Sequence, residues 1–108
     1  MKVDIIRATD AHVELLRQWR NANREWFFST AEISKEEQAN WWAILNNTNG
    51  EYQYIVLCND EPVGTFAVID GNPIEFMCVM IGRKDLSGKG VMKAALNQAF
   101  ALYSGKKA

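Results

Sequence analysis

The residues best suited to chemistry form a glycine-rich loop, Ile81 to Gly90, between an apolar run and an apolar helix pattern. Within it, Gly88 and Gly90 flank Lys89, and the helix pattern begins directly afterwards. A strand that leads through such a loop into a helix directs backbone N–H groups and the positive end of the helix dipole toward one point. The loop is therefore a candidate site for the phosphate groups of a cofactor.

The spacing of the loop argues against two common phosphate motifs. A mononucleotide P-loop needs four residues between its glycines and a Ser or Thr after the lysine. Here five residues separate Gly82 from Gly88, and Gly90 follows Lys89. A dinucleotide fingerprint needs a third glycine three positions after Gly90, and that position holds Lys93. An ATP site of the P-loop type is thus disfavoured, and a Rossmann site is only weakly indicated.

The loop resembles the acetyl-coenzyme A loop of the GNAT acetyltransferase superfamily, whose pattern is Gln/Arg-x-x-Gly-x-Gly/Ala after the fourth strand. Gly90 matches the glycine of this pattern, whereas Ser87 replaces Gln or Arg and Met92 replaces Gly or Ala. A long side chain at Met92 is expected to crowd the pyrophosphate. The resemblance implies that acetyl-coenzyme A binds along the fourth strand and the loop. The implied cofactor-binding residues are Val79, Met80, Ile81, Ser87, Gly88, Lys89, Gly90, Val91 and Met92.

The N-terminal part of the chain predicts one strand followed by two helices. Val3 to Arg7 is typical of a short strand, and Thr9 or Asp10 can cap the first helix. Residues 34–37, Ser-Lys-Glu-Glu, form a capping box that starts the second helix.

The remaining residues predict an antiparallel meander and a third helix. Runs of β-branched and aromatic residues cover 52–58, 63–69 and 74–81, separated by turn-forming segments. An apolar helix pattern then extends from about Gly90 to Tyr103. The order βααβββα is similar to the N-terminal two-thirds of a GNAT domain. The expected fold is α/β, a mostly antiparallel mixed sheet flanked by helices, which lacks the last strands of the family.

Segment 21–30, between the first two helices, is a candidate acceptor site. The chain resembles the GNAT branch that acts on ribosomal-protein N-termini, aminoglycosides or amino sugars, because it shares Arg7 and the Trp-Arg-Asn run 19–21. In that branch the segment between the helices usually walls the acceptor pocket. The resemblance therefore implies that an amine acceptor is held through charge and stacking by three residues: Arg24, Trp26 and Phe28. A plain core role for these aromatic residues is the alternative.

Glu75 is the candidate catalytic residue. Transfer of an acetyl group to an amine requires the ammonium to lose a proton, so a base must stand close to the attacking nitrogen. In several GNAT enzymes a glutamate early on the fourth strand accepts this proton, and Glu75 matches that place relative to Ile81. The alternative is that Glu75 faces solvent on one side of the meander.

The resemblance ends after the third helix, so residues 1–108 are expected to form one domain that is truncated relative to the family. The tyrosine that commonly protonates the leaving thiolate follows strand five in the family, and Tyr103 does not match it by position. The source of the general acid is therefore open. A sheet that ends at its fourth strand exposes an unpaired edge, which predicts a homodimer formed through that edge.

Composition narrows the class of protein further. The chain has 108 residues, 48% hydrophobic and 23% charged, with a net charge of −1, which suits one globular domain. This charge argues against partners such as nucleic acid or an anionic membrane. With no long apolar run or signal peptide, a cytoplasmic location is expected. Cys58 and Cys78 lie in predicted strands without metal-ligand spacing, so both are expected to be buried free thiols, with no metal site.

Two functions from different classes are consistent with these features. The first is an N-acyltransferase that moves an acetyl group from acetyl-coenzyme A to a primary amine by direct attack. The alternative is a catalytically degenerate module with the GNAT fold, which binds acyl-coenzyme A or dimerises without turnover.

Overall fold

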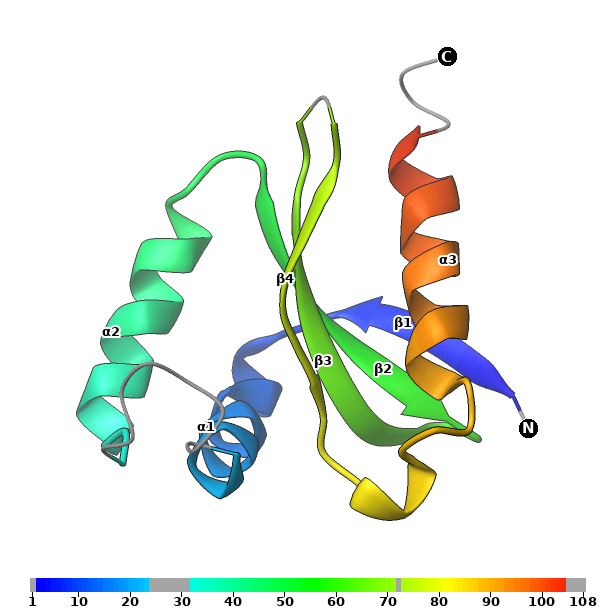
Figure 1. Ribbon diagram of the computed structural model, residues 1–108. Helices are drawn as coiled ribbons and strands as arrows, with labels where there is room; N and C mark the ends of the chain where they lie inside the picture. Colours follow the sequence, from blue (N-terminus) through cyan, green and yellow to red (C-terminus); the bar gives the residue numbers. More distant parts are fainter. Residues whose placement is uncertain (1, 24–31, 72, 105–108) are drawn as a thin grey trace. The chain divides into compact units, whose positions relative to one another are not determined.

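The computed structural model describes residues 2–23, 32–71 and 73–104, which belong to two compact units (Figure 1). One unit comprises residues 8–49, and the other comprises residues 1–7 and 50–108. Over the described residues the elements follow the predicted order βααβββα, with short 3-10 turns inserted at Asp10–His12 and Lys84–Leu86. The predicted α/β fold class is therefore confirmed.

The described part of the smaller unit contains two α-helices, which hydrogen bonds connect. A 3-10 turn over Asp10–His12 precedes α1 (Val13–Ala22), and α2 spans Lys35–Asn46. The predicted capping box is present, since the Ser34 hydroxyl accepts from the backbone N–H of Glu37 at 3.1 Å while the Glu37 carboxylate accepts from the N–H of Ser34 at 3.2 Å. The indole of Trp42 donates to Asp10 at 2.6 Å, which ties α2 to the turn before α1.

The larger unit contains an antiparallel sheet whose strand order is the chain order, β1-β2-β3-β4. The strands are β1 (Val3–Arg7), β2 (Glu51–Cys58), β3 (Glu61–Ile69) and β4 (Glu75–Ile81). Among the described residues, β1 and β4 are thus the edge strands.

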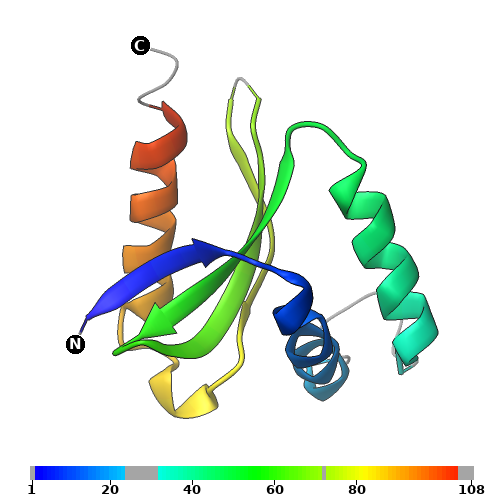
Figure 2. The same cartoon turned by 180° about the vertical axis from the view of Figure 1, so that it is seen from behind.

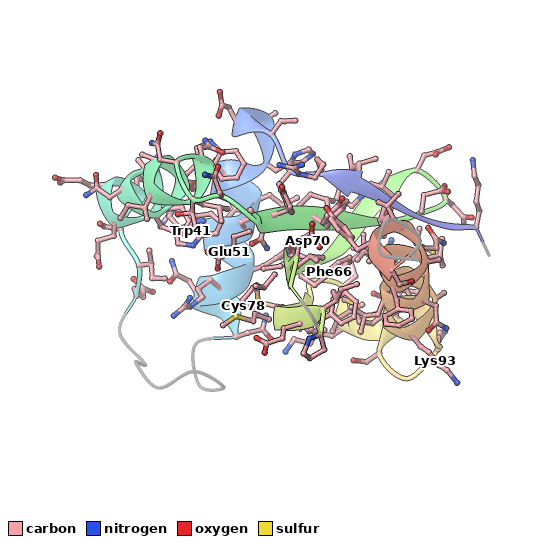
Figure 3. All side chains as sticks on the ribbon, turned by 90° about the horizontal axis from the view of Figure 1, so that it is seen from above. Trp41, Glu51, Phe66, Asp70, Cys78 and Lys93 are labelled. Atoms are coloured by element: carbon pink, nitrogen blue, oxygen red, sulfur yellow. The ribbon has the colours of Figure 1, made fainter. Side chains whose placement is uncertain are left out.

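Helix α3 (Val91–Ser104) packs on one face of this sheet (Figures 1 and 2). Its buried residues recur every fourth position, which places them on one side of the helix; they are Val91, Ala95, Ala99 and Tyr103. Facing them, the fully buried Phe66 ring stacks on Tyr54 at 5.5 Å and meets Phe76 edge-on at 5.9 Å. Figure 3 shows Phe66 in the space between the sheet and α3. This aromatic layer is the core that fixes the helix.

The C-terminal end of α3 is held by a second set of aromatic contacts. The hydroxyls of Tyr103 and Tyr54 are hydrogen-bonded at 2.6 Å, and the Tyr52 ring stacks on Tyr103 at 5.8 Å. The Arg7 guanidinium lies over the Tyr52 ring at 4.3 Å, within cation–π distance. Burial and the hydrogen bond to Tyr54 raise the pKa of Tyr103.

Because of this raised pKa, we expect Tyr103 to make the fold less stable at alkaline pH. An unfolded tyrosine ionises near a pKa of about 10, whereas folded Tyr103 stays protonated. Above that pH the unfolded state binds fewer protons than the folded state, so the free energy of unfolding falls as pH rises. The free energy of unfolding, measured in urea at about pH 8 and about pH 11, should fall more between these pH values for wild type than for Tyr103→Phe. Equal falls would contradict this expectation. At the lower pH the variant should be about 1 kcal/mol less stable, because it loses one buried hydrogen bond.

Candidate cofactor pocket

Strand β4 contains a bulge that separates its two halves. Thr65 pairs with Met80 and Ala67 pairs with Met77, so β4 carries one residue more than β3 over this stretch. Cys78 lies in the bulge with φ of 52°, in the left-handed region. Its thiol is free and exposed, whereas Cys58 is free and buried. The expectation of a buried Cys78 was therefore wrong, because the bulge interrupts the alternation of side chains that a regular strand would impose.

The loop after β4 is anchored to the sheet at its first residues. The backbone N–H groups of Gly82 and Arg83 both donate to the Val63 carbonyl, at 2.7 and 3.1 Å. A 3-10 turn over Lys84–Leu86 follows, and α3 begins after two glycines. Gly88 and Gly90 have φ of 77° and 79°, a backbone conformation that residues with a Cβ rarely adopt. The glycines are thus needed to bring the chain sharply from β4 into α3.

The charged side chains of the loop include an ion-paired arginine and several exposed lysines. Arg83 forms ion pairs with Glu61 and, at 2.7 Å, with Asp85. The hydrogen bond from Arg83 holds the pKa of Asp85 below its ordinary value. The lysines of the loop and the helix start are exposed: Lys84, Lys89 and Lys93. Figure 3 shows Lys93 on α3 with its side chain directed away from the sheet.

A pocket of about 400 Å³ lies between the end of β4, the loop and the first turn of α3. Apolar side chains and glycine backbone make up most of its wall, with one hydroxyl and one lysine. The lining residues are Val79, Ile81, Leu86, Ser87, Gly88, Gly90, Val91, Met92 and Lys93.

Most residues nominated from the sequence for cofactor binding are among these lining residues, and the exceptions are Met80 and Lys89. Met80 pairs with Thr65, so it faces the opposite side of the sheet from Ile81. Leu86 was missed, although an apolar residue within a polar loop is a recognisable signal. Met92 lies along the wall with its terminal methyl beside Gly64. This geometry does not favour the expected crowding of the pyrophosphate by the Met92 side chain.

Glu75 is located at the other end of β4. It is exposed, pairs with Ile69 and does not line the pocket. Glu75 and Ile81 pair with Ile69 and Gly64, which are five positions apart on β3, or about 17 Å at the rise of a β-strand. Because its neighbour Phe76 faces α3, Glu75 faces the opposite side of the sheet. Its role as a base stays a prediction.

The nominated acceptor residues and Tyr103 are not among the described residues that line the pocket. Arg24, Trp26 and Phe28 lie outside the described residues. Tyr103 is buried, with its hydroxyl bonded to Tyr54, and lies about 18 Å along α3 from the pocket at the rise of an α-helix. Within the described ranges, no His, Cys, Asp or Glu residues gather in a group that could hold a metal ion, and no helix is long and apolar enough to cross a membrane.

Comparison with solved structures identifies the fold. A domain from Methanocaldococcus jannaschii matches with a TM-score of 0.80 and 22% identity over 96% of this chain and 71% of that one. An acetyltransferase from Thermus thermophilus matches with a TM-score of 0.77 and 19% identity, over 94% and 69%. Spermidine N-acetyltransferase from Vibrio cholerae, solved with coenzyme A and spermine, matches with a TM-score of 0.72 and 19% identity, over 90% and 60%.

The chain therefore has the fold of the GNAT acetyltransferases, as the loop and the order of elements predicted. It spans 60% of the length of the Vibrio cholerae enzyme. No family model and no curated protein matches its sequence.

Substitution of Gly90 tests whether the loop holds its left-handed turn. Nothing lies within 4 Å of the place that a methyl group at Gly90 would occupy, so Gly90→Ala adds no steric clash. The backbone strain should nevertheless lower the free energy of unfolding by about 1 kcal/mol. Gly90→Asn is the matched control, because asparagine tolerates this conformation better, and it should lose less. If Gly90→Ala and wild type had equal free energies of unfolding in urea, the positive φ of residue 90 would not be maintained in solution.

Proposed function

We propose that this chain binds acetyl-coenzyme A and transfers the acetyl group to a primary amine. The observation that carries the proposal is the pocket between the bulged end of β4 and the start of α3. Its apolar wall suits the pantetheine arm, and its glycine turn at a helix N-terminus suits the pyrophosphate. The fold shared with the Vibrio cholerae enzyme, which was solved with coenzyme A and spermine, supports the same ligand and an amine acceptor.

In the proposed reaction the amine attacks the thioester directly. Glu75 accepts a proton from the ammonium, directly or through water, and the freed nitrogen attacks the carbonyl carbon. Backbone N–H groups stabilise the oxyanion of the tetrahedral intermediate. The C–S bond then breaks, the amide is released, and the thiolate leaves and takes up the second proton that the attacking nitrogen loses. No acyl-enzyme is formed.

Binding without turnover is the second candidate function. It is favoured by the position of Glu75, which is exposed and far from the pocket, and by the burial of the Tyr103 hydroxyl in the core. In this case the pocket would still hold acyl-coenzyme A, and no thiol would be released.

Two measurements on the same protein distinguish these functions. Acetyl-coenzyme A at about a hundred times its Kd should stabilise the fold by about 2.7 kcal/mol in thermal unfolding. No shift at millimolar ligand would reject both candidates. Release of free thiol with a panel of small amines would then indicate transfer, and Glu75→Gln should reduce the rate about 100-fold if this carboxylate is the base.

Glu51→Gln is the matched control for the Glu75 variant. Glu51 and Glu75 flank Ile69 in one row of the sheet, so both project from the same face. A general effect of charge on this face would slow both variants equally. A loss confined to Glu75→Gln supports a role in proton transfer, and unchanged turnover in Glu75→Gln rejects it.

We further propose that two copies of the chain associate through the edge of β4. Met77 and Val79 on this strand are 44% and 46% exposed, and the sheet order leaves one side of β4 without a neighbouring strand among the described residues. Light scattering at micromolar concentration should give the mass of a dimer, and Met77→Lys should shift it toward the monomer, because a charge on an edge strand disfavours pairing. A monomeric wild type would refute the proposal.

A further inference from the structure

The side chain of Met92 has an unusual position for a residue at the mouth of a phosphate-binding turn. It lines the pocket from the first turn of α3, yet its terminal methyl group lies against β3. A methyl group placed on Gly64 would be 3.0 Å from Cε of Met92, which is closer than ordinary van der Waals contact. The space that Met92 fills therefore exists because residue 64 has no side chain.

Gly64 does not itself line the pocket, but it lies directly behind it. It pairs with Ile81, which is a lining residue, and a methyl group at Gly64 would also be 2.9 Å from the Met80 carbonyl oxygen. Ile81 is thus paired with Gly64, and the methyl end of Met92 lies beside the same glycine.

We propose that Gly64 is a positioning residue for the cofactor pocket, because the gap above it holds the methyl end of Met92 against the sheet. Met92 lines the pocket from the first turn of α3, and its methyl end lies beside Gly64. If a side chain at residue 64 fills the gap over β3, the Met92 side chain turns toward the loop, where Ser87, Gly88 and Gly90 form the cradle. This inference rests on the proposed binding of coenzyme A, and it assigns a role in ligand access to a residue outside the pocket.

The position of the Met92 side chain also explains how the loop accommodates this long residue where the family pattern has Gly or Ala. With its methyl group over Gly64, Met92 adds apolar surface to the wall beside Ile81 and Leu86. Such a wall contacts the apolar arm of the ligand and leaves the glycine backbone open to the phosphates. Gly64 and Met92 therefore act as a pair.

Calorimetry tests this pair by measuring the affinity of four proteins for coenzyme A. The proteins are wild type, Gly64→Ala, Met92→Ala and the double variant. Gly64→Ala should weaken binding about tenfold, because the displaced Met92 side chain obstructs the cradle. Met92→Ala should weaken binding about threefold, because it removes part of the apolar wall, and it is the reference for the double variant. The double variant should recover most of the loss, since the obstructing side chain is gone. A merely structural effect of the added methyl would not be reversed by removing Met92.

Each failure has a distinct meaning. If wild type binds no coenzyme A, the proposed function fails. If wild type binds but Gly64→Ala binds equally well, or the double variant stays as weak as Gly64→Ala, the pairing is refuted. In that second case the contact with the Met80 carbonyl, rather than Met92, would control the pocket.

Two further measurements apply even if Gly64→Ala does not fold. In wild type labelled at its methionine methyl groups, the Met92 methyl should show a nuclear Overhauser effect to the Gly64 α-protons, with and without coenzyme A. Absence of this effect would refute the premise. Met92→Leu, whose branched end is too short to enter the gap, should bind more weakly than Met92→Ala; equal or tighter binding would count against the proposal.

Discussion

The packing of α3 on the aromatic face of the sheet is the constraint on which the pocket depends. Ala95 and Ala99 have small side chains on the buried side of the helix, so the backbone of α3 can approach the layer around Phe66 closely. Val91 is buried at the helix start. The helix therefore has a fixed origin, and the loop has to reach it from the end of β4. The pocket is the space that remains along this short path, and its shape follows from the core.

Much of this arrangement could be predicted from the sequence because it depends on local patterns. The capping box at Ser34, the turns between the strands and the glycine pair before α3 are signals within a few residues, and all lie where expected. The order of elements followed from them. Most of the nominated pocket residues follow from the same fact, since a strand, a loop and a helix start that are adjacent in sequence must also be adjacent in space.

The features that could not be predicted depend on pairing between distant residues. The bulge at Cys78 is visible only in the register of β4 against β3, so the exposure of its thiol had no signal in the local pattern. The direction of Met92 depends on Gly64, a residue on another strand. Glu75 was assigned by position along its strand, which fixes its distance from the loop but not what surrounds it.

The bulge has a consequence for association that goes beyond the pocket. An edge strand with exposed apolar residues is a template on which further strands can add without limit, as in fibrils. In β4 the extra residue breaks the edge into two short segments and increases the local twist. Each segment is too short to support a continuous cross-β stack. The same irregularity therefore disfavours open-ended polymerisation along this edge.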